Sequence, residues 1–127
     1  MSALVIDTSV WIDFFNGGSH PDLEQALQES RAFVAPIVVA ELLSGRLAPL
    51  EERKLTDGLA MLPLCETPLA HWIRVGRLRS LMSDRGVTIS APDAHVAQCA
   101  LDLDAQLLTR DRIFERIAKF TALKLAG

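Results

Sequence analysis

The stretch Ala3-Leu4-Val5-Ile6-Asp7 combines a continuous apolar run with an acid at its end. A run without polar alternation is expected of a strand that is buried on both faces, as strands of parallel sheets are. Further apolar runs at 32–35, 62–65, 106–109 and 122–125 alternate with amphipathic segments. This alternation predicts an α/β fold, a three-layer α/β/α sandwich with a central parallel sheet of about five strands.

Helices are expected between these strands, and several of the segments begin with Pro or Ser, as helix starts do. Ser90 is predicted to cap the helix at 91–101. The long helix at 68–85, with Thr67 as its cap, is predicted to turn toward the core the apolar residues Leu69, Trp72, Ile73, Leu78 and Leu81. The aromatic residues of the helix at 9–16 are also interpreted as core residues, namely Trp11, Phe14 and Phe15.

Length and composition limit the class of protein. A chain of 127 residues, half of them apolar, is expected to fold as a single domain spanning 1–127. The mean hydropathy of +0.24 is high for so small a chain, so we expect a partner or a second copy, in a homodimer, to cover part of the surface. The net charge of −3 would repel a phosphate backbone, so local geometry or a metal must overcome it if nucleic acid is the substrate.

The sequence predicts a cytoplasmic protein without a membrane segment. Cys65 and Cys99 show neither a C-x-x-C pairing nor the Cys and His spacing of a zinc site, so both are interpreted as buried thiols in a reducing compartment. The first apolar run meets Asp7 too early for a signal peptide. The run at 34–43 is interrupted by polar and Pro residues and is shorter than the ~20 residues that span a bilayer.

Four acids occupy positions that the predicted fold would bring together. Asp7 follows the first strand and Asp111 follows the strand at 106–109, so the two meet at the carboxyl edge of the sheet if these strands are neighbours. Glu41 lies in the helix after the second strand, and Asp93 lies in the first turn of the helix at 91–101. Clustered carboxylates repel one another, and oxygen ligands suit Mg²⁺ or Mn²⁺. The pattern therefore predicts metal-assisted phosphodiester hydrolysis.

Each acid also has a purely structural interpretation. Asp7 and Asp111 are placed as turn or helix-cap residues often are, and Asp93 could compensate a helix dipole. Glu41 is harder to explain in this way because an acid within an apolar helix is costly to bury without a partner. His95 faces away from Asp93 and is interpreted as structural, whereas no polar cluster is predicted around His20 and His71.

With these acids in place, the chain resembles the PIN-domain ribonucleases, and most closely the VapC-type toxins of bacterial toxin-antitoxin pairs. The resemblance runs the full length of the chain. It is carried by four motifs in order, Val5-Ile6-Asp7-Thr8-Ser9-Val10-Trp11-Ile12, Val39-Ala40-Glu41-Leu42, Pro92-Asp93-Ala94-His95-Val96-Ala97 and Leu107-Leu108-Thr109-Arg110-Asp111-Arg112-Ile113-Phe114. It implies an α/β/α sandwich whose acids surround one or two divalent cations.

The resemblance also implies roles for single residues. Asp7 and Asp93 look like the principal metal ligands, and Glu41 and Asp111 complete the acidic pocket directly or through waters. Two hydroxyl residues match positions that steady such a site or touch the substrate, Ser9 and Thr109. The implied activity is that of an endoribonuclease dependent on Mg²⁺ or Mn²⁺. The implied partner is a cognate antitoxin whose basic C-terminal segment folds onto the toxin.

Two alternatives remain within the same resemblance, a housekeeping PIN nuclease and a non-catalytic PIN-like module that binds RNA or protein. Two other classes fit poorly. A dehalogenase-like phosphatase needs a second Asp two residues after the first, where this chain has Ser9. A receiver domain needs a phosphate-accepting Asp after its third strand, where this chain has Cys65 and Glu66.

Overall fold

Short apolar runs form the strands of the computed structural model, which describes residues 2–127. The strands are β1 (Leu4–Ile6), β2 (Ala32–Phe33), β3 (Gln106–Leu108) and β4 (Lys124–Leu125). All neighbours pair in parallel, in the order β2-β1-β3-β4. The inner strand β1 is buried along its whole length, as its unbroken apolar run predicts. The predicted α/β class with a parallel sheet is confirmed.

The prediction of about five strands was wrong by one, because the run at 62–65 makes only an isolated bridge. Leu64 pairs with Val34 in parallel, and two hydrogen bonds flank the pair, from the Val34 N–H to the Pro63 carbonyl (3.0 Å) and from the Cys65 N–H to the Val34 carbonyl (2.9 Å). Pro63 has no N–H to donate, so it cannot extend the pairing into a ladder. The sheet therefore has four strands, with a single bridge beyond β2.

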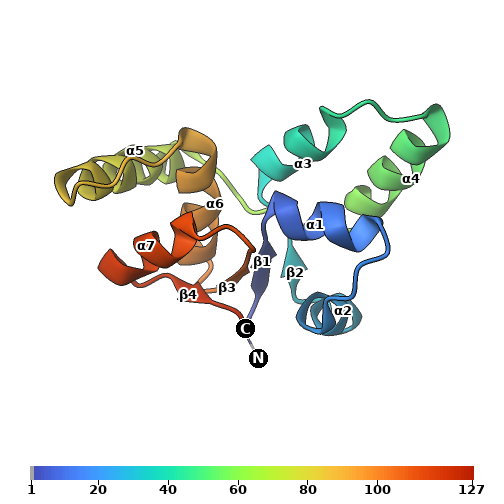
Figure 1. Ribbon diagram of the computed structural model, residues 1–127, viewed down its shortest axis with the longest axis horizontal. Coiled ribbons are helices and arrows are strands. Elements are labelled where there is room, and N and C mark those ends of the chain that lie inside the picture. Colours follow the sequence, from blue (N-terminus) through green and yellow to red (C-terminus); the bar gives the residue numbers. More distant parts are fainter. Residues whose placement is uncertain (1) are drawn as a thin grey trace.

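Helices lie on both sides of the strands (Figure 1). They are α1 (Thr8–Phe15), α2 (Pro21–Gln28), α3 (Pro36–Leu43), α4 (Pro49–Ala60), α5 (Leu69–Asp84), α6 (Ala91–Asp102) and α7 (Ile113–Phe120). Proline occupies the first turn of α2, α3, α4 and α6, where its missing N–H has no intrahelical role. Helix α2 packs on β1 and β2, and α6 packs on β1 and β3, which completes the predicted three layers.

Two expectations from composition can be compared with the described residues. Cys65 and Cys99 are both buried free thiols, as predicted. None of the helices within residues 2–127 is long and apolar enough to cross a bilayer.

Helix α5 buries a different face from the one that the sequence predicted. Its buried residues are His71, Val75, Leu78 and Met82, a stripe at helical spacing. Of the five apolar residues predicted to face the core, only Leu78 does so, and the exposed ones are Leu69, Trp72, Ile73 and Leu81. The prediction failed because the first buried residue of this stripe is His71. A search for apolar residues at helical spacing does not count a polar residue as part of the buried face. The predicted cap was also wrong, because Pro68 occupies the cap position and makes no side-chain hydrogen bond.

The aromatic residues of α1 divide between the core and the surface. Trp11 is buried and Phe14 is partly buried against the core, as predicted, but Phe15 is 46% exposed. The Phe15 ring stacks on Trp11 with 5.6 Å between ring centroids, so its inner face is covered while its outer face is free.

Two leucines of equal size give a test of this core. Leu107 in β3 is completely buried, so Leu107→Ala should lower the free energy of unfolding by about 2 to 5 kcal/mol. Leu50 is 63% exposed and lies in no proposed interface, so Leu50→Ala should change it by less than about 0.5 kcal/mol. Urea denaturation of both variants measures the two values. Equal losses would contradict this division between core and surface.

Candidate metal centre

The carboxyl ends of β1 and β3 bring the first and last acidic motifs together. The two strands are neighbours, with Ile6 opposite Leu108, and the Asp7 N–H donates to the Leu108 carbonyl at 2.9 Å. The next strand after β1 in the chain, β2, lies beside one edge of β1, and the following strand, β3, lies beside its other edge. The order of strands therefore reverses at β1. Open parallel sheets form their sites at such reversals.

Asp7 has the carboxylate with the most hydrogen-bond donors among the four predicted site acids. One oxygen, Oδ1, accepts from the Thr8 N–H at 2.9 Å, and the other, Oδ2, accepts from the hydroxyls of Thr109 (2.8 Å) and Ser9 (3.3 Å). Its exposed fraction is 8%. Burial raises the pKa of the Asp7 carboxyl above its ordinary value, although the donors from Thr109, Thr8 and Ser9 oppose the rise.

Glu41 is exposed on α3 and is held by α1. The Thr8 hydroxyl donates to Glu41 Oε1 at 2.7 Å. Thr8 therefore serves two acids, through its backbone N–H to Asp7 and through its side chain to Glu41. Of the Asp7-Thr8-Ser9 motif, Ser9 was predicted to support the site but Thr8 was not. The adjacent hydroxyl was visible, but its reach to Glu41 depends on how α1 packs against α3.

Asp93 lies in the first turn of α6, whose predicted cap is present. The Asp93 N–H donates to the Ser90 hydroxyl at 3.1 Å. Burial raises the pKa of Asp93, and the negative charges of Asp111, Asp7 and Glu41 raise it further, against the opposing hydrogen bond with Ser90. Asp93 thus lies close enough to the other three acids for their charges to act on it.

Asp111 joins the same site through Thr109. The Asp111 N–H donates to the Thr109 hydroxyl oxygen at 3.0 Å, and that hydroxyl donates in turn to Asp7. The exposed carboxylate of Asp111 accepts from the Ile113 N–H at 3.0 Å, at the start of α7. One threonine side chain therefore sets the position of both Asp7 and Asp111. We call Asp7, Glu41, Asp93 and Asp111 together the carboxylate centre.

The carboxylate centre fits a hydrated divalent cation. Every ion pair within residues 2–127 uses a different set of acids, namely Asp13, Glu29, Asp102 and Asp104, so no described Lys or Arg neutralises the centre. No three of its carboxylates bring one oxygen each within 4.8 Å of one another. Such spacing does not suit a closed protein cage. It suits a divalent cation that keeps part of its water shell.

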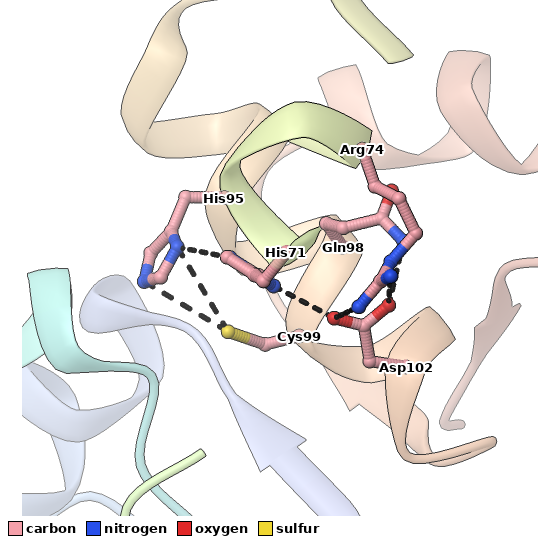
Figure 2. Close-up of polar contacts among 6 residues, drawn as sticks. All are labelled: His71, Arg74, His95, Gln98, Cys99 and Asp102. Carbon is pink, nitrogen blue, oxygen red and sulfur yellow. Dashed lines mark hydrogen bonds and ion pairs between the residues drawn. The ribbon is translucent and has the colours of Figure 1, made fainter. Parts of the chain in front are cut away.

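A second polar cluster lies between α5 and α6 and was not predicted (Figure 2). His71 Nδ1 lies 2.7 Å from Asp102 Oδ2, and His71 Nε2 lies 2.8 Å from His95 Nδ1. Asp102 also accepts from Arg74 and Gln98. The interpretation of His71 as a residue without a polar cluster was wrong, because its partners are distant in sequence. Burial, and then the neighbouring His71, lower the pKa of His95 to about 4, so its ring is neutral at pH 7.

Comparison with known proteins identifies the family. The model of the PIN domain matches residues 4–120, so the chain belongs to the PIN domain family. No curated protein sequence matches the chain.

Several solved structures share the fold. DNA-bound VapBC from Salmonella typhimurium has a TM-score of 0.81 at 18% identity, over 99% of this chain and 98% of that one. VapBC2 from Rickettsia felis, bound to a DNA fragment from the promoter, has a TM-score of 0.77 at 21% identity, over 98% and 97%. A toxin-antitoxin complex from Klebsiella pneumoniae has a TM-score of 0.68 at 23% identity, over 87% and 88%.

Burial of Asp93, together with repulsion from the other acids of the carboxylate centre, predicts that Asp93→Asn stabilises the metal-free protein. The pKa of Asp93 is raised by folding, so the folded state holds this proton more tightly than the unfolded chain does. The ionised carboxylate therefore costs stability at neutral pH, and this cost disappears as the pH falls below the ordinary value of 3.8. In EDTA, the Tm of Asp93→Asn should exceed that of the unmodified chain at pH 7, and the difference should shrink toward pH 3.5.

Asp104→Asn provides a control of opposite sign. The hydrogen bond from Lys124 lowers the pKa of Asp104, so loss of this carboxylate should not raise the Tm at pH 7. A stabilisation of both variants alike would attribute the effect to net charge and would contradict repulsion at the centre.

Proposed function

We propose that this PIN domain is a Mg²⁺- or Mn²⁺-dependent endoribonuclease that hydrolyses phosphodiester bonds in RNA. The observation that carries the proposal is the carboxylate centre, four acids without a described cationic partner at the reversal point of a parallel sheet. Carboxylates that raise one another's pKa are poorly suited to a purely structural role. RNA is the proposed substrate because the four motifs resemble those of PIN-domain ribonucleases.

The proposed role of each acid follows from how many hydrogen bonds hold its carboxylate in place. A bound divalent cation would lower the pKa of a water and offset the charge that develops on the phosphate. Asp7, fixed through both oxygens by Thr8, Thr109 and Ser9, would be the most rigid ligand. Asp93 would be the second principal ligand.

The two remaining acids are exposed and can turn toward solvent. Glu41, steadied by Thr8, and Asp111 would complete the ligand shell directly or by orienting waters. A carboxylate that holds a water accepts its hydrogen bond and thereby orients the water's lone pair for attack on phosphorus.

Two arginines beside the centre provide contacts for an RNA backbone that the net charge would otherwise repel. Arg110 and Arg112 flank Asp111 and are exposed, and with Thr109 they line a pocket of about 340 Å³. Arg112 has no ion-pair partner within residues 2–127, whereas Arg110 lies 3.5 Å from Asp13. Guanidinium groups recognise phosphate oxygens in pairs, so these side chains are placed to hold the strand near the cation.

Alanine substitution of each acid tests the proposed chemistry. Asp7→Ala, Asp93→Ala, Glu41→Ala and Asp111→Ala should each lower the rate of RNA cleavage by on the order of 100-fold or more, without unfolding the domain. Asp84→Ala, at the far end of α5, is the control and should cleave normally. EDTA should stop cleavage and Mn²⁺ should restore it. Cleavage that survives EDTA or Asp7→Ala would refute metal-dependent hydrolysis.

We further propose that the nuclease is the toxin of a toxin-antitoxin pair and acts in the cytoplasm. A groove of about 470 Å³ between α1, α3 and α4 is lined by apolar and charged side chains, one of which is an acid of the centre; its lining includes Ile12, Phe15, Leu42, Leu55, Glu41, Glu51 and Lys54. Ile12 and Phe15 are about half exposed. An apolar antitoxin segment would cover them, and its basic residue would reach Glu41 and compete with the metal. The shared fold of the Klebsiella pneumoniae toxin-antitoxin complex supports this assignment.

A second copy of the chain is the proposed occupant of an exposed apolar surface on α5. On α5, the side chains of Leu69, Trp72 and Ile73 are exposed. A homodimer that covered them would explain the high mean hydropathy. A housekeeping PIN nuclease or a non-catalytic binding module would share the fold but would have no inhibitory partner.

Phe15→Asp separates inhibition from catalysis. The substitution places a charge in the groove but leaves the four acids in place, so capture of the adjacent gene's product should fall by on the order of 10-fold while cleavage of RNA persists. Met61→Asp, which is 86% exposed and outside the groove lining, is the control and should retain the partner. Undiminished capture by Phe15→Asp would place the partner elsewhere, and full RNase activity of the complex would refute inhibition.

A further inference from the structure

A line of hydrogen bonds runs from the end of α6 to the backbone of α3. Asp102 contacts His71 Nδ1 (2.7 Å), and His71 Nε2 contacts His95 Nδ1 (2.8 Å), as Figure 2 shows. The Ile37 N–H then donates to His95 Nε2 at 3.5 Å. We call Asp102, His71, His95 and the Ile37 N–H the histidine relay. Asp102 and His95 belong to α6, His71 belongs to α5, and Ile37 belongs to α3.

The two ends of the histidine relay fix every proton in it. Although burial opposes it, hydrogen bonds from Arg74, Gln98 and His71 lower the pKa of Asp102, so its carboxylate only accepts. His71 must then carry a proton on Nδ1. At the opposite end, the Ile37 N–H can only donate, so His95 Nε2 must be bare and the neutral His95 ring carries its proton on Nδ1. His95 Nδ1 then donates to His71 Nε2, which must be bare. Taken together, the two ends require one pair of tautomers.

We infer that His95 is a positioning residue of the carboxylate centre, because its Nε2 caps α3, the helix of Glu41, against α6, the helix of Asp93. The inference rests on the proposed function. Ala35, at the cap position of α3, offers no side-chain acceptor, and the Ile37 N–H is one of the donors that a helix start leaves unpaired. Glu41 follows Ile37 by four residues and so lies on the same face of α3, one turn further along.

Few other polar contacts hold α3 in place. Within residues 2–127, two hydrogen bonds join α3 to other elements, the one from Ile37 to His95 and the one from Thr8 to Glu41. The first fixes α3 relative to α6, and the second fixes it relative to α1. Loss of the first would leave Glu41 tied to the Asp7 side of the centre, with only side-chain packing to hold it relative to Asp93.

Packing holds the His95 ring in the orientation that the relay requires. Trp72 stacks on it with 4.6 Å between ring centroids and 5° between planes, and the His71 ring meets it edge-on at 88°. The Cys99 sulfur lies 3.8 Å from Nε2 and 4.0 Å from Nδ1. The ring is 1% exposed and cannot turn without displacing these neighbours.

The two histidine rings and Cys99 could in principle bind a metal ion, but the distance between the two ring nitrogens does not fit one. His71, His95 and Cys99 offer one ligand atom each within 4.8 Å of one another. Two nitrogens on a tetrahedral zinc ion lie about 3.3 Å apart, given Zn–N bonds of about 2.05 Å. The observed 2.8 Å between the imidazole nitrogens is a hydrogen-bond distance. The relay therefore accounts for the contacts better than an ion does.

Nitrogen NMR of the histidine side chains reads the relay directly, without reference to RNA cleavage. In the ¹⁵N-labelled, metal-free protein at pH 7, His71 and His95 should both carry the proton on Nδ1 and have a bare Nε2. A proton on Nε2 of either ring would overturn the proposal. Added Zn²⁺ should leave these resonances in place, whereas a Zn²⁺ complex that is lost in Cys99→Ala would show a metal site instead.

Substitutions at His95 test the positioning role, with Mn²⁺ affinity measured by paramagnetic resonance of the free ion. His95→Leu removes the acceptor and should weaken Mn²⁺ binding by on the order of 10-fold. His95→Gln places an amide oxygen near the Nε2 position and should restore the affinity. Cys99→Ala disturbs packing beside the same ring but keeps the relay, so it should bind Mn²⁺ normally. Equal affinity of His95→Leu and His95→Gln would overturn the proposal.

If His95→Leu does not fold, a variant at Asp102, the end of the histidine relay away from α3, tests the same coupling. Asp102→Asn replaces the acceptor-only carboxylate with an amide that can also donate, which releases the His71 tautomer. Mn²⁺ binding should weaken together with the loss of the Nδ1–H signals. Unchanged affinity with altered tautomers would refute the coupling. A chain with both predicted tautomers but no Mn²⁺ binding would overturn the proposed function, and with it the positioning role, while the cap on α3 remained.

Discussion

The candidate site depends on the parallel pairing of β1 with β3. That pairing sets Ile6 opposite Leu108, and the next rung is made by Asp7 itself, whose N–H donates to the Leu108 carbonyl. The backbone ladder thus ends at a site acid, and the Thr109 hydroxyl lies within reach of Asp7 because both residues leave the same edge. A shift of one residue in register would turn these side chains to the opposite faces of the sheet.

The carboxylate centre is an electrostatic compromise. Hydroxyl and backbone donors stabilise Asp7, yet its burial still raises its pKa, and Asp93 is raised by burial and by the other acids. A more stable domain would lack some of these charges. Such charges beside the hydroxyls of Thr8, Ser9 and Thr109 are typical of sites that keep destabilising groups for function. The histidine relay shows the opposite design, since every polar atom in it has a partner.

The sequence predicted the location of a residue best where that location depends only on its place in a strand or helix. Asp7 and the strand at 106–109 could be placed because a continuous apolar run marks a buried strand and its end marks the sheet edge. The run at 62–65 had the same apolar character, but Pro63 limits its pairing to one bridge. His71 could not be interpreted, because its partners Asp102 and His95 lie 31 and 24 residues away. Contacts of this kind follow from packing and leave no periodic signal.

The distance in sequence between β1 and its partner has a consequence for synthesis. The hydroxyl that orders Asp7 comes from Thr109, 102 residues later, and β1 lies between β2 and β3 in the sheet. A nascent polypeptide that has passed only α5 out of the ribosome can pair β1 with β2 but has no β3 to close its other edge. Such non-local closure is slow compared with helix formation. The carboxylate centre therefore assembles only when translation is almost complete, and a partly synthesised chain on the ribosome does not yet carry an intact site.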